Sequence, residues 1–248
     1  MKIETTTPRV RTDPTNPPAG LSDAGHIPRT RHIVPVIGLV ALLLNFIGLG
    51  GIGDAPAPHD EPSSMAAHFE LVRDGIFITA PFGILGAAAT VAFMLALARR
   101  LHARGESMSA AALVTGGLLA ACYLIAIQVV YTSLADGAAA SSPEATKALF
   151  VPTILAAPVF GLGTSVALGG AAFGATRARL QPRWWSVMSV VAAIVAAIAI
   201  FSYADSNFFS PDVQQQTAFG ALQLWLLVTS ITMLLRGRRE NRSDGQFT

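Results

Sequence analysis

Six long apolar stretches constrain the fold of this chain more than any other feature of its sequence. They cover residues 33–52, 75–98, 109–134, 148–175, 184–204 and 217–235. About 20 helical residues, at ~1.5 Å of rise each, match a hydrocarbon layer of about 30 Å. The central thirds of the stretches contain no Asp, Glu, Lys, Arg or His. We therefore predict an all-α, polytopic transmembrane helical bundle with six spans.

The composition agrees with lipid as the medium of the chain. It is 52% hydrophobic and only 13% charged, with a mean hydropathy of +0.52. The net charge of +2 does not indicate a nucleic-acid partner, because the cations flank apolar runs instead of forming a basic domain. We expect contact with membrane lipid and no nucleic acid, with an apolar small molecule or a membrane protein as the candidate specific partner.

Two polar tails flank the predicted transmembrane domain at 31–235. Residues 1–30 hold five prolines and no apolar period, which is typical of a disordered tail, and residues 236–248 show no sign of further structure. Fifteen of the seventeen Lys and Arg residues fall on the side of the membrane that the tails share, whereas nine of the fifteen acids fall on the other. This bias predicts a plasma-membrane protein with both termini in the cytoplasm.

Small residues recur at helical spacing in two of the predicted spans. Gly170 and Gly174 form a GxxxG pair in the fourth, and Gly116 forms a stripe with Ala112 and Ala120 in the third. Such stripes let helix backbones approach closely in lipid. We expect them to serve packing within the bundle in preference to dimerisation.

A proline–glycine segment occurs at 80–86 in the second span and again at 157–163 in the fourth. Segments of this kind can break a helix and open a midplane site in transporters. No polar residues cluster at either segment, so we predict two tolerated kinks. In the fifth span, Trp184 and Trp185 follow Arg183, and their position predicts interfacial anchors.

The segment 59–74, between the first two spans, carries the polar residues of greatest interest. If one continuous helix runs from here into the second span, Glu70 and Asp74 lie one turn apart on one face, and Arg73 can pair with Glu70. An arginine on the predicted outer side goes against the usual bias. It therefore indicates a partner, which is Glu70, a phospholipid headgroup or a substrate anion.

Three interpretations of this cluster remain open. Glu70 and Asp74 are candidate catalytic acids that protonate an apolar substrate, with His68 and Arg73 as candidate ligand-binding residues. Alternatively, His68 and His59 join these carboxylates around a divalent metal, although we assign no metal site. The third interpretation is a solvated, charged helix end above the membrane.

Isolated polar residues and glycines within the spans offer less chemistry. Asn45 and Gln128 are expected to bridge helices or to contact a ligand. Gly48, Gly50 and Gly53 match the GxGxxG spacing of a dinucleotide loop, but they close a membrane span and no strand precedes them. We therefore expect no cofactor.

Several short motifs together resemble an uncharacterised family of multi-pass, six-span integral membrane proteins that is common in actinobacteria. The motifs lie at 68–74, at 99–101, at 182–184 and at Leu224-Trp225 before the final arginine-rich exit. The resemblance covers about 33–239. It implies the same topology, and the family has no assigned activity to carry over.

The expected function is binding of a lipid-like or small apolar ligand at the outer cluster around Glu70, Arg73 and Asp74. One alternative is a membrane-embedded isoprenoid or terpene cyclase or transferase that uses a carboxylic acid as proton donor, because the chain lacks a DDxxD motif for diphosphate ionisation. Another is a non-catalytic accessory subunit of a membrane complex, packing through Gly170 and Gly174. Whether the chain is an enzyme stays open at this point.

Overall fold

The computed structural model describes residues 30–53, 55–138, 142–201 and 210–244, and this part of the chain is helical without any strand. Six helical segments in it are long and apolar enough to cross a membrane. They are Ile33–Gly50, Arg73–His102, Ser107–Gly137, Pro143–Arg177, Arg183–Phe201 and Val213–Arg236. The predicted all-α bundle with six spans is confirmed.

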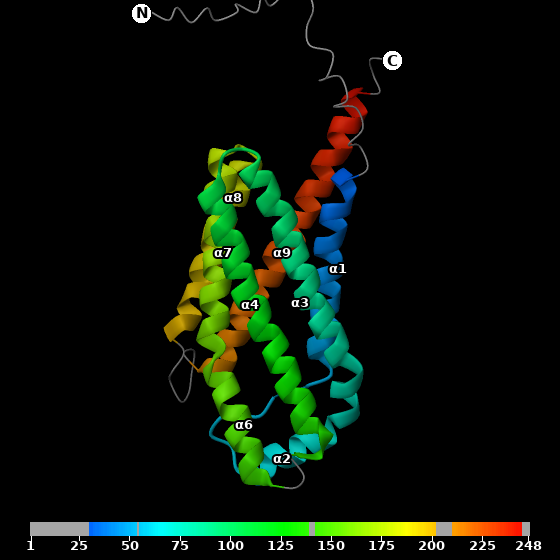
Figure 1. Cartoon of the computed structure of the whole chain (residues 1–248), viewed down its shortest axis with the longest axis vertical. Helices are drawn as coiled ribbons and strands as arrows, with labels where there is room; N and C mark the ends of the chain where they lie inside the picture. Colours follow the sequence, from blue (N-terminus) through cyan, green and yellow to red (C-terminus); the bar gives the residue numbers. More distant parts are fainter. Residues whose placement is uncertain (1–29, 54, 139–141, 202–209, 245–248) are drawn as a thin grey trace, which may run out of the picture.

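The helices follow one another with short connections. From the N-terminus the elements are α1 (Thr30–Gly50), α2 (Pro62–Leu71), α3 (Arg73–His102), α4 (Ser107–Ser133), the π-helical turn η1 (Leu134–Ala138), α6 (Pro143–Leu155), α7 (Ala157–Arg177), α8 (Arg183–Ile198), the 3₁₀ turn η2 (Ala199–Phe201) and α9 (Pro211–Asp244). Of these, α2 is too short to span a membrane, and it lies across one end of the bundle (Figure 1).

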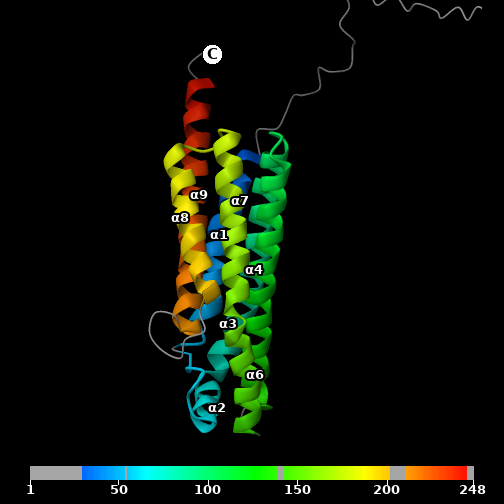
Figure 2. The ribbon, with the colours of Figure 1, turned by 90° about the vertical axis from the view of Figure 1, so that its left-hand side faces the viewer.

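The six spans form a closed ring of antiparallel neighbours in the order α1, α3, α4, α7, α8 and α9, with α9 packed back against α1 (Figures 1 and 2). The start of α1, the end of α9 and the connections 102–107 and 177–183 lie at one end, which we call the arginine end. The opposite end, where α2 lies, is the α2 end. Because the span count is even, the chain enters and leaves the bundle at the arginine end.

Helices α4 and α7 pack through the predicted small-residue stripes. A methyl group added to Gly163 would lie 2.7 Å from the backbone nitrogen of Ala120, and one added to Gly170 would lie 2.8 Å from the Cβ of Ala112. The expectation that these stripes serve internal packing is confirmed. Gly170 and Gly174 are buried against α4 and the end of α3, so the interface expected for an accessory subunit is wrong, because the protein's own helices cover it.

The fourth span differs from its prediction in its start and its continuity. It begins at Pro143, earlier than expected, and it breaks at Ala156 into α6 and α7. Pro158, in the first turn of α7, has no N–H to donate. Beside the break, the Tyr123 hydroxyl donates to the carbonyl oxygen of Thr153 at 3.3 Å. The second span is different, because α3 continues through Pro81.

The sixth span extends beyond the predicted limits in both directions. Helix α9 begins at Pro211 and stays helical to Asp244, so the expectation that the tail 236–248 has no further structure is wrong over most of its length. The predicted disorder of residues 1–30 falls almost entirely outside the described residues.

The two adjacent tryptophans of α8 occupy different environments. Trp184 is 54% exposed, as an interfacial anchor would be, but Trp185 is fully buried. The indole N–H of Trp185 donates to Oγ1 of Thr229 on α9, and that of Trp225 donates to Oγ of Ser189 on α8, both at 2.9 Å. The anchor prediction is therefore wrong for Trp185, because this ring belongs to the α8–α9 contact.

Candidate functional site

A bend at Val72 divides the predicted polar cluster between two helices. Val72 closes α2 with φ −95° and ψ 8°, and α3 starts at the next residue. The expected continuous helix is therefore wrong, and Glu70 and Asp74 do not share one helical face. The bend lets α2 bury Met65 and Phe69 across the end of the bundle while α3 runs along it.

The structure does not gather the charged residues of the cluster into a site. Glu70, Asp74, Arg73 and His59 are all exposed. The Arg73 guanidinium carbon lies 5.8 Å from the centre of the Phe77 ring, a cation–π contact within α3. Over the described residues, no group of three or more His, Cys, Asp or Glu side chains is placed to hold a metal ion. Nothing in this arrangement favours acid catalysis or metal binding at the cluster.

His68 is the one member of the cluster that reaches into the bundle. Its Nε2 lies 3.2 Å from the carbonyl oxygen of Ile52, so the ring N–H can donate to the turn that follows α1. The imidazole also meets the edge of the Phe69 ring, with the two centres 5.6 Å apart. His68 thus connects α2 to the end of α1.

Three aromatic rings seat α2 against the rest of the bundle. Phe69 of α2 lies 5.8 Å from Tyr131 of α4 and 5.5 Å from Phe150 of α6, and Tyr131 and Phe150 are stacked at 6.2 Å. All three side chains are buried. Contacts of this geometry add to the hydrophobic gain from burial, so α2 is a fixed part of the fold.

The loop before α2 is held by a lysine. The ammonium group of Lys147 on α6 donates to the carbonyl oxygen of Asp60 at 2.9 Å. The Asp60 carboxylate accepts from the backbone N–H of Ala57 at 2.8 Å. Lys147 is one of only two cations that the sequence places on the predicted outer side, and this contact gives it a structural role.

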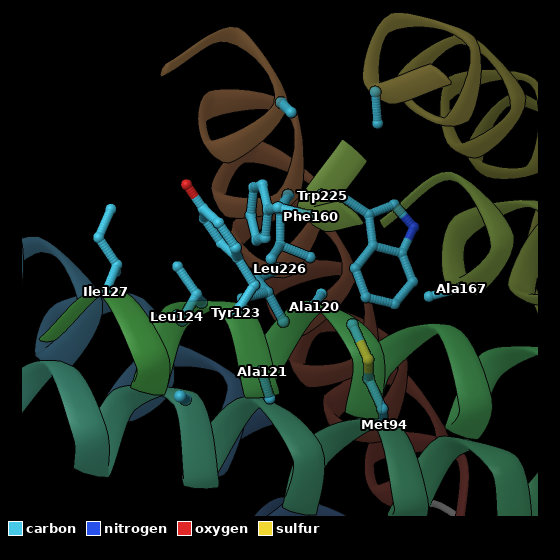
Figure 3. Packing of buried hydrophobic residues seen from close by; sticks show 14 of the residues in the cluster. Met94, Ala120, Ala121, Tyr123, Leu124, Ile127, Phe160, Ala167, Trp225 and Leu226 are labelled. Carbon is cyan, nitrogen blue, oxygen red and sulfur yellow. The ribbon is translucent and has the colours of Figure 1, made fainter. Parts of the chain in front are cut away.

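A cavity of about 240 Å³ lies at the α2 end between α1, α4, α6, α7 and α9. Its apolar wall consists of Leu49, Ile52, Leu124, Ile154, Phe160 and Phe219. Figure 3 shows Leu124 of α4 inside the bundle near Tyr123 and Phe160, whose ring centres are 5.7 Å apart. A space of this kind, lined mainly by apolar and aromatic side chains, is the usual setting for a small-molecule site.

The polar groups of the cavity lie toward its mouth. The loop residues Gly53, Ala55 and Pro56 form one side of the mouth, and Gln215 and Gln216 of α9 form another. Tyr131 joins the wall from α4, and among the described residues none that lines the cavity carries a charge. His68 and Tyr131 connect this site to α2, since His68 contacts the carbonyl of the lining residue Ile52.

Asn45 and Gln128 bridge helices, which is one of the two roles that the sequence predicted for them. The side-chain amide of Asn45 donates to Oγ1 of Thr90 at 3.1 Å, from α1 to α3. That of Gln128 donates to the carbonyl oxygen of Gly48 at 3.3 Å, from α4 to α1, and it passes over Gly83 of α3. Neither residue lines the cavity.

A comparison of the chain with family models, with curated proteins and with solved structures finds no match in any of the three. The actinobacterial family resemblance therefore stays a prediction.

Sequence reasoning missed the cavity because its wall consists of ordinary apolar residues from five helices. One signal did point to it. Three consecutive glutamines, 214–216, stand where the sixth span begins, and two of them line the mouth. Long polar side chains at the start of an apolar helix indicate a solvent-accessible region. The sequence pattern alone does not show what these side chains face.

Proposed function

We propose that this chain is a plasma-membrane protein that binds a small, mostly apolar ligand in the cavity at the α2 end. The observation that carries the proposal is a cavity whose described lining is uncharged, with an apolar wall and a polar mouth. Burial of apolar surface supplies the affinity, and the few polar groups at the mouth orient the ligand. The site thus differs from the exposed cluster around Glu70, Arg73 and Asp74.

The size of the cavity limits the ligand. An apolar cavity of about 150 Å³ holds a benzene molecule. Scaled by volume, the ~240 Å³ cavity suits a molecule of about ten non-hydrogen atoms. A whole phospholipid does not fit, although one end of a longer chain does.

Binding without chemistry is the better-supported function. A cyclase that starts by protonation needs an acid inside the substrate cavity, and no Asp or Glu lines this one within the described part of the chain. Glu70 and Asp74 are exposed at the α2 end instead. The subunit alternative loses its proposed surface, because Gly170 and Gly174 are buried within the bundle.

We further propose that the arginine end faces the cytoplasm and the α2 end faces outward. The support is the bias of Lys and Arg toward one side, together with the bundle, which brings the connections rich in arginine to a common end. With Cys122 replaced by serine, a Ser64→Cys variant should react with a membrane-impermeant maleimide on intact cells, and Ser107→Cys only after lysis. The reverse pattern would contradict this orientation.

Photolabelling tests the binding proposal. The protein is reconstituted with a diazirine derivative of octane, irradiated and mapped by mass spectrometry, with excess nonane as competitor. Saturable adducts are expected on Leu124, Phe160 and Phe219. Leu124→Trp, which fills the cavity, should lower them at least about fivefold because it removes the space.

The matched control is Leu118→Trp, because Leu118 lies on α4 but is 46% exposed at its lipid-facing surface. It should label like the wild type. If cavity adducts do not saturate, or if both variants label equally, the cavity is not a binding site.

A further inference from the structure

A buried glutamine without any hydrogen-bond partner lies just behind the cavity. Gln223 of α9 is 2% exposed, and neither Oε1 nor Nε2 finds a partner among the described residues. A carboxamide in an apolar interior is costly when unpaired. The interior of a helix offers no free backbone N–H to its oxygen, so the helix that carries Gln223 cannot satisfy it.

A second unpaired group accompanies it. Thr164 of α7 is fully buried, and its hydroxyl has no partner among the described residues. Thr79, Thr90 and Thr132, in contrast, each donate to the carbonyl four residues earlier at 2.8 Å. Ser186 and Ser230 also lack partners, and one rotation can turn a hydroxyl such as theirs or that of Thr164 to its own helix. The inference therefore depends chiefly on Gln223. Gln223 has both a donor and an acceptor to satisfy.

The helical register places each group one turn beyond a residue of the cavity wall, and neither group lines the cavity itself. Thr164 follows the lining residue Phe160 by four residues, and Gln223 follows Phe219 by four. At ~1.5 Å per residue, each stands about 6 Å deeper in the membrane. Helices α7 and α9 run in the same direction, from the α2 end toward the arginine end, and they are in contact. Cα–Cβ bonds tilt toward the helix N-terminus, so both side chains lean back toward the cavity.

We infer that Gln223 and Thr164 form the hydrogen-bonding inner end of the cavity and hold the hydroxyl group of an uncharged alcohol. The apolar body of the alcohol fills the space between Leu124 and Phe219. This inference rests on the proposed function and names the chemistry of its ligand. Phe219 is the movable wall, because it is only partly buried and its ring meets the exposed Phe46 edge to face at 6.1 Å. In this proposal, rotation of the Phe219 ring opens a path from the cavity to Gln223 and Thr164.

The hydrogen-bonding atoms of the Gln223 amide favour a hydroxyl group on the ligand. An alcohol donates to Oε1 of Gln223 and accepts from its Nε2 or from the Thr164 hydroxyl. A ketone accepts but does not donate, and it would leave Oε1 unpaired. An ionised carboxylate or ammonium would lose its water shell without a counter-charge, because none of the described residues that line the cavity is charged. Of these classes, only a neutral alcohol donates to Oε1 while its oxygen also accepts from a neighbouring donor.

Competition between 1-octanol and nonane tests the inference. They have nine non-hydrogen atoms each and differ in the hydroxyl group. Each is titrated, at matched mole fraction in the lipid, against photolabelling of the cavity by the diazirine octane. In the wild type, 1-octanol should compete about tenfold better than nonane, which corresponds to about one hydrogen bond beyond simple burial.

Gln223→Met keeps the volume of the side chain and removes its hydrogen bonds, and it should abolish the preference while the thermal midpoint stays equal or rises. Thr164→Val should reduce the preference. Thr232→Val is the control, because the Thr232 hydroxyl donates within α9 to the carbonyl of Val228. It should leave the preference unchanged.

The outcomes separate the two proposals. Equal competition by both compounds in the wild type, or a preference that persists in Gln223→Met, overturns the alcohol site and leaves the cavity as a general apolar site. Failure of both compounds to compete overturns the proposed function itself. If Gln223→Met is poorly folded, the comparison of Thr164→Val with Thr232→Val decides, since an unchanged preference in Thr164→Val contradicts the inference.

Discussion

The contact between α4 and α7 changes character along its length, from a tight seam toward the arginine end to a cavity at the α2 end. In the seam, Gly116 and Gly163 let the two backbones touch. Nearer the α2 end, the same helices present Tyr123, Leu124 and Phe160, and the space beside them is part of the cavity. The comparison shows that residue size along two helices decides where this bundle is closed and where it leaves a cavity.

The physical reason lies in the membrane. Lipid gives no hydrophobic gain for helix association, so close packing depends on small residues that allow many van der Waals contacts. Aromatic side chains are large and hold helix backbones farther apart. The chain combines both kinds of contact on one helix pair.

The seam should be the part most sensitive to mutation. Gly163→Leu is expected to destabilise the fold by at least about 3 kcal/mol and to prevent purification of a monodisperse protein, because the new side chain meets the backbone of α4. Gly169→Leu on the same helix is the control, since a Cβ at Gly169 meets nothing within 4 Å. Similar thermal melts for the two variants would contradict the tight seam.

The α2 end should respond more locally. Phe69→Ala removes a fully buried ring from the Tyr131–Phe150 cluster and should cost about 3–5 kcal/mol. The effect should appear as faster hydrogen exchange over α2 while the spans stay protected. Leu71→Ala, at a position that is 84% exposed, should change little. Uniform loss of protection in every span would show that α2 and the bundle unfold as one unit.

The α8–α9 contact is a third kind of seam, held by side-chain hydrogen bonds. Trp185→Phe should cost about 1–2 kcal/mol, because Thr229 loses its indole partner in an apolar interior. Trp184→Phe should be nearly neutral, since Trp184 is largely exposed. Thermal unfolding of the two variants in the same detergent measures the difference, and equal midpoints would argue against the bond to Thr229.

The smallest effect is expected at the charged cluster. A double variant, Glu70→Gln with Asp74→Asn, should change the free energy of unfolding by less than about 0.5 kcal/mol, because both side chains are exposed. Labelling of the cavity should also be unchanged. Loss of labelling in a well-folded double variant would return the functional site to the exposed cluster.

Periodicity and glycine spacing predicted the parts of the fold that depend on local sequence. The six spans, the packing role of the Gly116 and Gly170 stripes and the bridging amides of Asn45 and Gln128 all follow from residue type and helical spacing. The features that the sequence analysis predicted wrongly depend on contacts with other helices. Burial of Trp185 requires Thr229 on α9, and the bend at Val72 requires a surface on which Phe69 can pack.

The candidate site could not be predicted for the same reason. Sequence patterns drew attention to Glu70, Arg73 and Asp74 because charges are rare in such a chain, yet these side chains are exposed at the surface. His68, from the same segment, contacts a residue of the cavity wall through the carbonyl of Ile52. The cavity residues themselves are unremarkable in sequence and are brought together from five helices.

The sequence by itself determined that the chain forms six membrane-crossing helices and that its arginines gather at one end, because helix length, hydropathy and charge act locally. Only the tertiary structure decided where the helices touch and where they leave a cavity. That outcome depends on the sizes of side chains that meet across helices, and on whether a buried group such as the Gln223 amide finds a partner there.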